Sequence, residues 1–257
     1  MSYPKFPRLA FALSLKTNGD DAKSCLRAAR DAALRVAPGL TAWTGVNNDI
    51  IKPEHISDTL GRPAAAIDAA IEVSAPNGDD PAQLVDVARE VGRIIADIVR
   101  PDESDVILGL SYSALAKGTS SHANVLTLCR DRRVDPDFLV RWWEIHHSRF
   151  NMYSPLGRKV YQQILSYELT NGTDELSQAA ASVAGLRATR DVYESSYIND
   201  VDQFLADVSE SNFGEPNILD EDGFFAHEWR TGTPEEAAEA RKTNRDTLYM
   251  AMVDILS

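Results

Sequence analysis

The stretch IDAAIEVSAPNGDDPAQLVDVAREVGRIIADIVRPDESDVILGL, residues 67–110, decides the fold of this chain. In its first seven residues, one set of alternate positions holds Ile67, Ala69, Ile71 and Val73, and the other holds Asp68, Ala70 and Glu72, which is typical of a half-buried strand. Between Asp80-Pro81 and Pro101, apolar residues recur every three or four positions, and this spacing predicts an amphipathic helix. Residues 106–110 are largely apolar again and predict a second strand.

The residues before this stretch predict the rest of a first half. A strand is expected at 11–15, ended by Asn18-Gly19, and an alanine-rich helix at 21–36, ended by Pro38-Gly39. Residues 40–46 contain tryptophan and threonine and predict another strand. The resulting order is β-α-β-β-α-β, the split βαβ arrangement of an α+β fold.

A similar order recurs after a small, polar stretch at 116–121, which predicts a linker between domains at 1–118 and 119–257. The elements expected in the second half are strands at 124–129, 159–169 and 192–198, helices at 135–150 and 201–210, and a final helix with Leu248, Met252 and Ile255 on its apolar face. A period above 100 residues indicates domain duplication.

Composition excludes several classes of function. The 26 basic and 39 acidic residues give a net charge of −13, which disfavours nucleic-acid binding, and no apolar run is long enough to span a bilayer. With only Cys25 and Cys129, a reducing cytoplasm is the natural expectation. The sequence contains no glycine-rich phosphate loop and no Gly-x-Ser-x-Gly motif, which argues against nucleotide use and serine hydrolysis.

The residues richest in chemistry lie in the helix expected at 135–150. Trp142, Trp143, His146 and His147 share one broad face of it. Tryptophan supplies flat apolar area for an aromatic ligand, and histidine exchanges protons near neutral pH. Alternatively, these side chains have no role in binding or catalysis and pack in a core or at its rim.

This run resembles the signature of EthD-like proteins of the dimeric α+β barrel superfamily, over about residues 122–228. The matching residues are Asp137, Phe138, Trp142, Trp143, His147, Gly157, Arg158, Tyr161 and Gln162. The resemblance implies two ferredoxin-like repeats that pair within one chain as a pseudo-dimeric barrel. It also implies chemistry without a cofactor or metal on a small hydrophobic, aromatic or polyketide-like substrate.

The resemblance also implies a role for each site residue. His147 would be the general acid or base, and Tyr161, on the strand expected there, would polarise a carbonyl or donate a proton. Arg158 would anchor an oxyanion or carboxylate, Trp143 would form a wall, and His146 is a weaker candidate. In the first half, a degenerate binding site around Trp43, Asn47 and Asn48 is an alternative.

The function predicted from these residues is a lyase, isomerase or cyclase in the catabolism or biosynthesis of aromatic or extended hydrophobic compounds. Two alternatives stay open. One is a haem-degrading or cofactor-free monooxygenase of the same fold, and the other is an accessory protein that binds a ligand without turnover. The chain is expected to be either a monomer with paired halves or a homodimer, for which the C-terminal helix could supply the interface.

Overall fold

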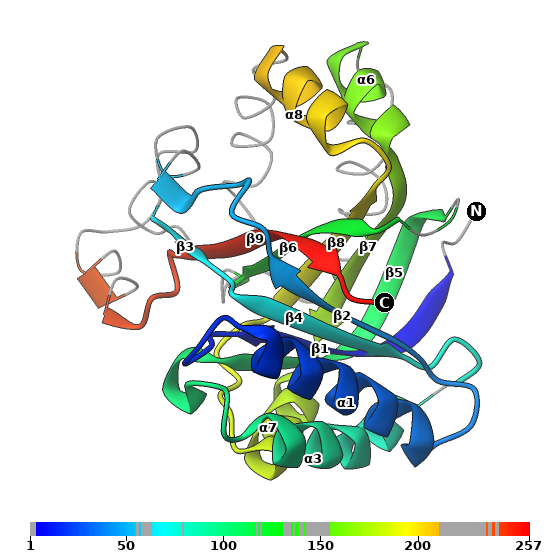
Figure 1. Cartoon of the computed structure of the whole chain (residues 1–257), viewed down its shortest axis with the longest axis vertical. Coiled ribbons are helices and arrows are strands. Elements are labelled where there is room, and N and C mark those ends of the chain that lie inside the picture. Colours follow the sequence, from blue (N-terminus) through cyan, green and yellow to red (C-terminus); the bar gives the residue numbers. More distant parts are fainter. Residues whose placement is uncertain are drawn as a thin grey trace.

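The computed structural model describes residues 4–54, 57, 63–78, 80–116, 118, 120–130, 135, 137–138, 141, 155–210, 235, 238–239 and 242–257, without the side chains of 114, 116, 155–158 and 208–210. Its labelled helices and longer strands, shown in Figure 1, are β1 (Lys5–Leu13), α1 (Asp20–Val36), β2 (Thr41–Asn47), β3 (Ala64–Ala66), β4 (Ala69–Ser74), α3 (Leu84–Ile95), β5 (Asp105–Ala116), β6 (His122–Leu128), α6 (Pro155–Gln163), β7 (Ile164–Gly172), α7 (Asp174–Ala184), β8 (Val192–Ile198), α8 (Val201–Glu210) and β9 (Leu248–Ile255).

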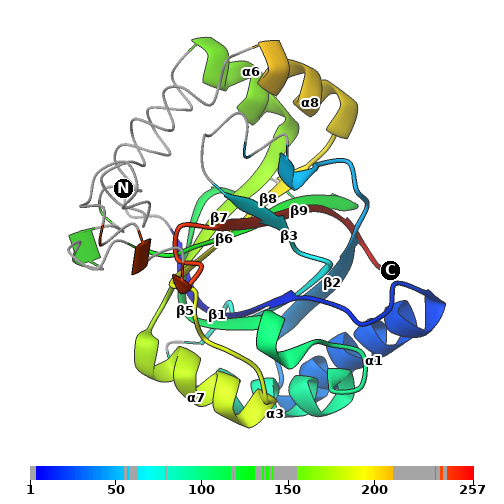
Figure 2. The same cartoon turned by 90° about the vertical axis from the view of Figure 1, so that its left-hand side faces the viewer.

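Eight of the described strands close an antiparallel barrel in the order β2-β4-β1-β5-β7-β8-β6-β9. The ring is completed between β9 and β2, where Gly45 faces Ile255 and Asn47 faces Val253. The short β3 pairs in parallel with residues 248–250 of β9, on the same edge of β9 as β2. Figure 2 shows the strands curving round this ring. The chain is therefore an α+β protein built on a closed barrel.

The four strands of each half follow the same spatial order. Along the chain, the barrel strands of the first half are β1, β2, β4 and β5, and those of the second half are β6, β7, β8 and β9. In the sheet, both sets have the order second, third, first, fourth: β2-β4-β1-β5 and β7-β8-β6-β9. For the barrel strands of the first half, the predicted β-α-β-β-α-β order is confirmed; the short β3 is an addition between β2 and β4. The second half differs because α7, which the sequence pattern did not predict, lies between its second and third strands.

Helices cover the barrel on two opposite sides, as Figure 2 shows. Helices α1, α3 and α7 pack on the outer faces of β1, β4 and β5, where Leu9, Phe11 and Leu13 are fully or almost fully buried against them. On the opposite side, α6 and α8 place Val160 and Phe204 in a second apolar cluster with residues of β7, β8 and β9. No helix in the described part of the chain is long and apolar enough to cross a membrane.

Close contact between α3 and α7 depends on a glycine. A Cβ atom built on Gly92 would lie 2.5 Å from both Cα and the carbonyl oxygen of Ala184. Real Cβ atoms do not approach other atoms so closely, so any larger residue would push α7 away from α3.

Two predicted elements of the second half were wrong. Residues 159–169 are not one strand, because α6 runs to Gln163 and β7 begins at Ile164. Val160, Tyr161 and Ile164 repeat at helical spacing and all three are buried on the same cluster, so packing favours a helix there. Tyr161 therefore lies on a helix, not on a strand.

The predicted C-terminal helix is also wrong, because residues 248–255 form β9. Both faces of this strand are buried: Leu248 and Met252 contact the cluster under α6 and α8, whereas Ala251 and Val253 point into the barrel. A strand buried on both faces reads as a continuous apolar run, which can be mistaken for a helix. The expectation of a homodimer interface on a C-terminal helix therefore no longer applies, because these residues form a strand of the barrel.

Candidate active site in the mouth of the barrel

Most of the predicted site lies outside the described residues. This holds for Trp143, His146 and His147, and only the backbone of Arg158 is described, in α6. Tyr161 is described and is 6% exposed, with its ring centroid 5.8 Å from that of Tyr167 in an edge-to-face arrangement.

Tyr161 lies beside a hydrogen-bonded pair on the outer face of the sheet. The phenol of Tyr167, on β7, donates to Oε2 of Glu194, on β8, at 2.7 Å. A carboxylate that accepts from a nearly buried tyrosine is held in place beneath α6. This face thus combines aromatic surface with a positioned acidic group.

The interior of the barrel holds a second group of polar residues. Side chains alternate along each strand, so Arg8, Ala10 and Ala12 of β1 point inward while Leu9 and Phe11 point toward the helices. The interior of an eight-stranded barrel is just wide enough to be filled by side chains. Alanines on β1, β4, β6 and β9 leave room there for larger residues.

Arg8 occupies that room and is only 1% exposed. Its Nη2 pairs with Oε2 of Glu72 at 3.1 Å and also contacts Oε2 of Glu168. Its other nitrogens donate to hydroxyl groups: Nη1 to Thr170 and Ser195 at 3.3 and 3.2 Å, and Nε to Ser74 at 3.4 Å. The guanidinium is therefore fixed by partners on β4, β7 and β8.

Glu72, on β4, is 2% exposed and lies at the centre of the cluster. Its Oε2 accepts from Nε1 of Trp43 at 3.0 Å and from the phenol of Tyr197 at 3.3 Å, besides the pair with Arg8. Trp43 Nε1 also contacts the Tyr197 oxygen. The other carboxylate oxygen, Oε1, is buried, as is the phenol of Tyr193, which interacts with the Glu72 carboxylate.

The two tyrosines of this cluster are neutral at physiological pH. Burial, followed by the charge of Glu72, raises the pKa of Tyr193 and of Tyr197 far above the ordinary value of a phenol. Both phenols can therefore donate hydrogen bonds throughout the working pH range.

The cluster forms the floor of a cavity of about 610 Å³ at one mouth of the barrel. Apolar groups of Phe6, Trp43 and Ile255 line it, together with Arg8, Glu72, Glu168 and Tyr197. The side chain of Glu168 is 14% exposed, which makes it the more accessible of the two carboxylates. Carboxylate and phenol groups converging on an apolar cavity can exchange protons with a bound molecule.

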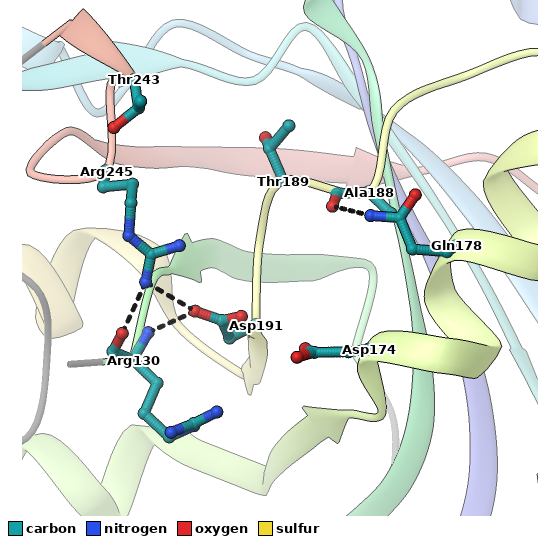
Figure 3. A pocket seen from close by; sticks show the side chains of 8 residues that line it. All are labelled: Arg130, Asp174, Gln178, Ala188, Thr189, Asp191, Thr243 and Arg245. Atoms are coloured by element: carbon teal, nitrogen blue, oxygen red, sulfur yellow. Dashed lines mark hydrogen bonds and ion pairs between the residues drawn. The ribbon is translucent and has the colours of Figure 1, made fainter. Parts of the chain in front are cut away.

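A second cavity, of about 590 Å³, lies near the N-terminus of α7 (Figure 3). There Asp191 accepts from the backbone N–H of Arg130 at 2.7 Å and from Nη2 of Arg245 at 3.3 Å. Arg245 also donates to the Arg130 carbonyl at 2.7 Å. Through these contacts Arg130, which follows β6, is bound to Asp191, which precedes β8, and to Arg245, which precedes β9. We therefore assign these residues a structural role.

Sequence patterns pointed to only one residue of the barrel-mouth site. Trp43 was the centre of the alternative site in the first half, and it lines the cavity. Asn47 and Asn48 do not line it; Asn48 instead donates to Asp254 at 2.8 Å. Arg8, Glu72 and Glu168 were missed, although a charged residue at an inward position of an otherwise apolar strand is a usable signal. Within the described residues, no three acidic, histidine or cysteine side chains could hold a metal ion.

No protein-family model and no curated protein matches this chain. Solved structures with a similar backbone include a proposed monooxygenase from Fusobacterium nucleatum (10% identity, TM-score 0.49, covering 100% of this chain and 94% of that one). Another is a mutant chlorite dismutase from Candidatus Nitrospira defluvii (9% identity, TM-score 0.48, covering 100% of this chain and 92% of that one). A third is an anthrone oxidase-like protein (9% identity, TM-score 0.46, covering 100% of this chain and 94% of that one). Likeness at this level does not bear on what the chain binds or converts, and the EthD-like resemblance stays a prediction.

Proposed function

We propose that this chain is an enzyme that transforms a small hydrophobic molecule by acid–base catalysis in the mouth of its barrel. One observation carries the proposal: the buried Arg8 and Glu72 and the partly exposed Glu168 form the floor of a cavity that Trp43 and Tyr197 also line. Buried charged groups cost free energy that apolar filling would avoid, so their presence in a cavity favours a functional role.

Each group has a distinct task in this proposal. Glu168, the more exposed carboxylate, removes a proton from carbon next to a carbonyl of the substrate. The neutral phenol of Tyr197 turns from Glu72 to donate a hydrogen bond to the oxygen on which negative charge develops. Return of the proton from Glu168 to another atom completes an isomerisation, and loss of a leaving group completes a lyase reaction.

The remaining residues position these two groups. Arg8 holds both carboxylates, and Trp43 supplies a flat apolar wall for an aromatic or extended substrate. A cofactor is not required for proton transfer of this kind.

The outer face under α6 is the second candidate location for the same chemistry. There we keep the proposal that His147 and Tyr161 are catalytic, and that Trp143, Arg158 and His146 bind substrate. The contact of buried Tyr161 with Tyr167, whose phenol donates to Glu194, favours it. The barrel mouth ranks first because it combines a cavity of about 610 Å³ with a charged floor.

We also propose that the barrel is a pseudo-dimer of two βαββαβ halves. The identical strand order of β2-β4-β1-β5 and β7-β8-β6-β9 supports this origin. Pairing of β5 with β7 and of β2 with β9 would then correspond to the two contacts between halves.

Proton exchange in deuterated water tests the proposed function without knowledge of the final product. The protein is incubated with a panel of aromatic and polyketide-like ketones, and deuterium uptake at carbon is followed by mass spectrometry. Glu168→Gln should lower the exchange rate by about 100-fold, which is within the usual contribution of a general base. Glu90→Gln, which alters an exposed carboxylate on α3, is the matched control and should exchange normally. An unchanged rate in a folded Glu168→Gln variant would refute the assignment.

A further inference from the structure

Three residues set the charge of the barrel-mouth cavity. Arg8, Glu72 and Glu168 are the only charged residues among the described ones that line it, so its floor carries one negative charge in excess. Each of the five N–H groups of Arg8 has a partner: one at Nε, two at Nη1 and two at Nη2. The Arg8 side chain is also only 1% exposed. The guanidinium therefore compensates the two carboxylates and has no donor left for a bound anion.

The excess charge lies on the carboxylate that faces the cavity. Glu72 is 2% exposed, and the side chains of Trp43 and Tyr197 donate to it besides its pair with Arg8. The side chain of Glu168 is 14% exposed and pairs with the same guanidinium. The further hydrogen bond to its Oε1, from a hydroxyl group on the same strand, is long, at 3.4 Å. A bound molecule therefore meets the negative charge of Glu168 and not that of Glu72.

An uncharged substrate keeps the total charge of the occupied cavity at one negative unit throughout the proposed reaction. When a C–H bond next to a carbonyl breaks, its proton forms an O–H bond with Glu168 and its electron pair stays on the substrate as an enolate. The floor loses its excess negative charge as the substrate gains one. An anionic substrate would instead hold two negative charges among the apolar groups of Phe6, Trp43 and Ile255. A cation would pair with Glu168 and block the base.

We propose that this cavity selects uncharged carbonyl compounds with an aromatic or extended apolar body, and that Glu168 is the residue that excludes their carboxylate counterparts. This inference rests on the proposed function, because it names the substrate class of the same cavity. A volume of about 610 Å³ is within the range of cavities that hold small organic molecules. Charges interact more strongly in such an apolar site than in water, so the repulsion between Glu168 and a bound carboxylate is large enough to decide which compound binds.

NMR titration at neutral pH with three probes that share one ring tests the proposal: acetophenone, benzoate and benzylammonium. Benzoate has nearly the shape of acetophenone but is negatively charged. We expect acetophenone to bind about 10- to 100-fold more tightly than benzoate, the order expected for two like charges in a partly apolar site. Benzylammonium should bind no more tightly than acetophenone, because Glu168 is already paired with Arg8. In Glu168→Gln, the difference between acetophenone and benzoate should fall to about threefold or less, whereas Glu90→Gln should keep it.

Three outcomes overturn the inference: benzoate binds as tightly as acetophenone, benzylammonium binds more tightly than both, or folded Glu168→Gln still discriminates fully against benzoate. Failure of acetophenone to bind at all also overturns it. If Glu168→Gln does not fold, Glu72→Gln, which removes the same unit of charge from the floor, should narrow the difference instead, and an unchanged difference counts against the inference. Absence of the preference for acetophenone, with Glu168-dependent deuterium exchange intact, refutes this inference alone. The preference without any such exchange refutes the proposed reaction alone.

Discussion

Replacing Arg8 by methionine should destabilise the protein more than almost any other single substitution in the barrel. Methionine fills much of the same volume but leaves Glu72 and Glu168 buried without the cation that pairs with both. Removing one partner of a buried ion pair typically costs about 3–5 kcal/mol, because the remaining charge stays desolvated. Here two carboxylates and three hydroxyl groups lose their partner, so we expect a loss at the upper end of that range.

Urea denaturation followed by circular dichroism measures this loss as a fall in the free energy of unfolding. With an m-value of about 3 kcal/mol/M, a loss of 4–5 kcal/mol lowers the midpoint by roughly 1.5 M. The matched comparison is the triple variant Arg8→Met, Glu72→Gln, Glu168→Gln, which removes all three charges together and should recover more than half of the loss. A cost below about 1 kcal/mol for Arg8→Met alone would show that the cluster is not buried as described.

Two further perturbations have clear expected results. Gly92→Ala should lower stability by about 1–3 kcal/mol despite alanine's better helix propensity, because its Cβ would overlap the backbone of Ala184; a rise in melting temperature would contradict the α3–α7 contact. Stability should also fall as the pH rises above about 10, since Tyr193 and Tyr197 stay protonated in the folded protein while the same residues ionise in the unfolded chain. This fall should be shallower in Tyr197→Phe by up to about 1.4 kcal/mol per pH unit, and an equal slope in both proteins would show that the phenol is not protected.

The first half of the chain was predictable because its elements are separated by strong local signals. Proline marks both ends of the stretch that contains α3, and its apolar spacing matches a helix with one buried face. In β4, alternation of residues between the helices and the barrel interior follows the strand period. Local pattern and tertiary packing agree in these elements.

In the second half, two elements were predicted wrongly because their structure depends on tertiary packing that produces no local sequence pattern. Strand β9 is buried on both faces, so its apolar residues show no period of two. The residues at 159–163 contain valine and tyrosine, which favour strands, yet burial of Val160 and Tyr161 on one face makes them helical. Tertiary burial overrode the local preference in both segments.

The barrel-mouth site could not be read from sequence because it is assembled from strands far apart in the chain. Arg8, Glu72 and Glu168 meet only because β4 and β1 are neighbours and β7 lies one strand beyond, across β5. The spacing of these three residues along the chain does not indicate which strands are neighbours in the sheet. The inward position of Arg8 was available from alternation in β1, but its partners needed the sheet topology.

The most direct test of the central claim compares deuterium exchange in variants of the two candidate locations under identical conditions. With the barrel mouth as the site, Glu168→Gln and Tyr197→Phe should lose about 100-fold in rate, whereas His147→Ala and Tyr161→Phe should stay within about threefold of the unmodified protein. The opposite result, in which the two barrel variants exchange normally and the other two do not, would contradict the account and move the chemistry to the outer face under α6.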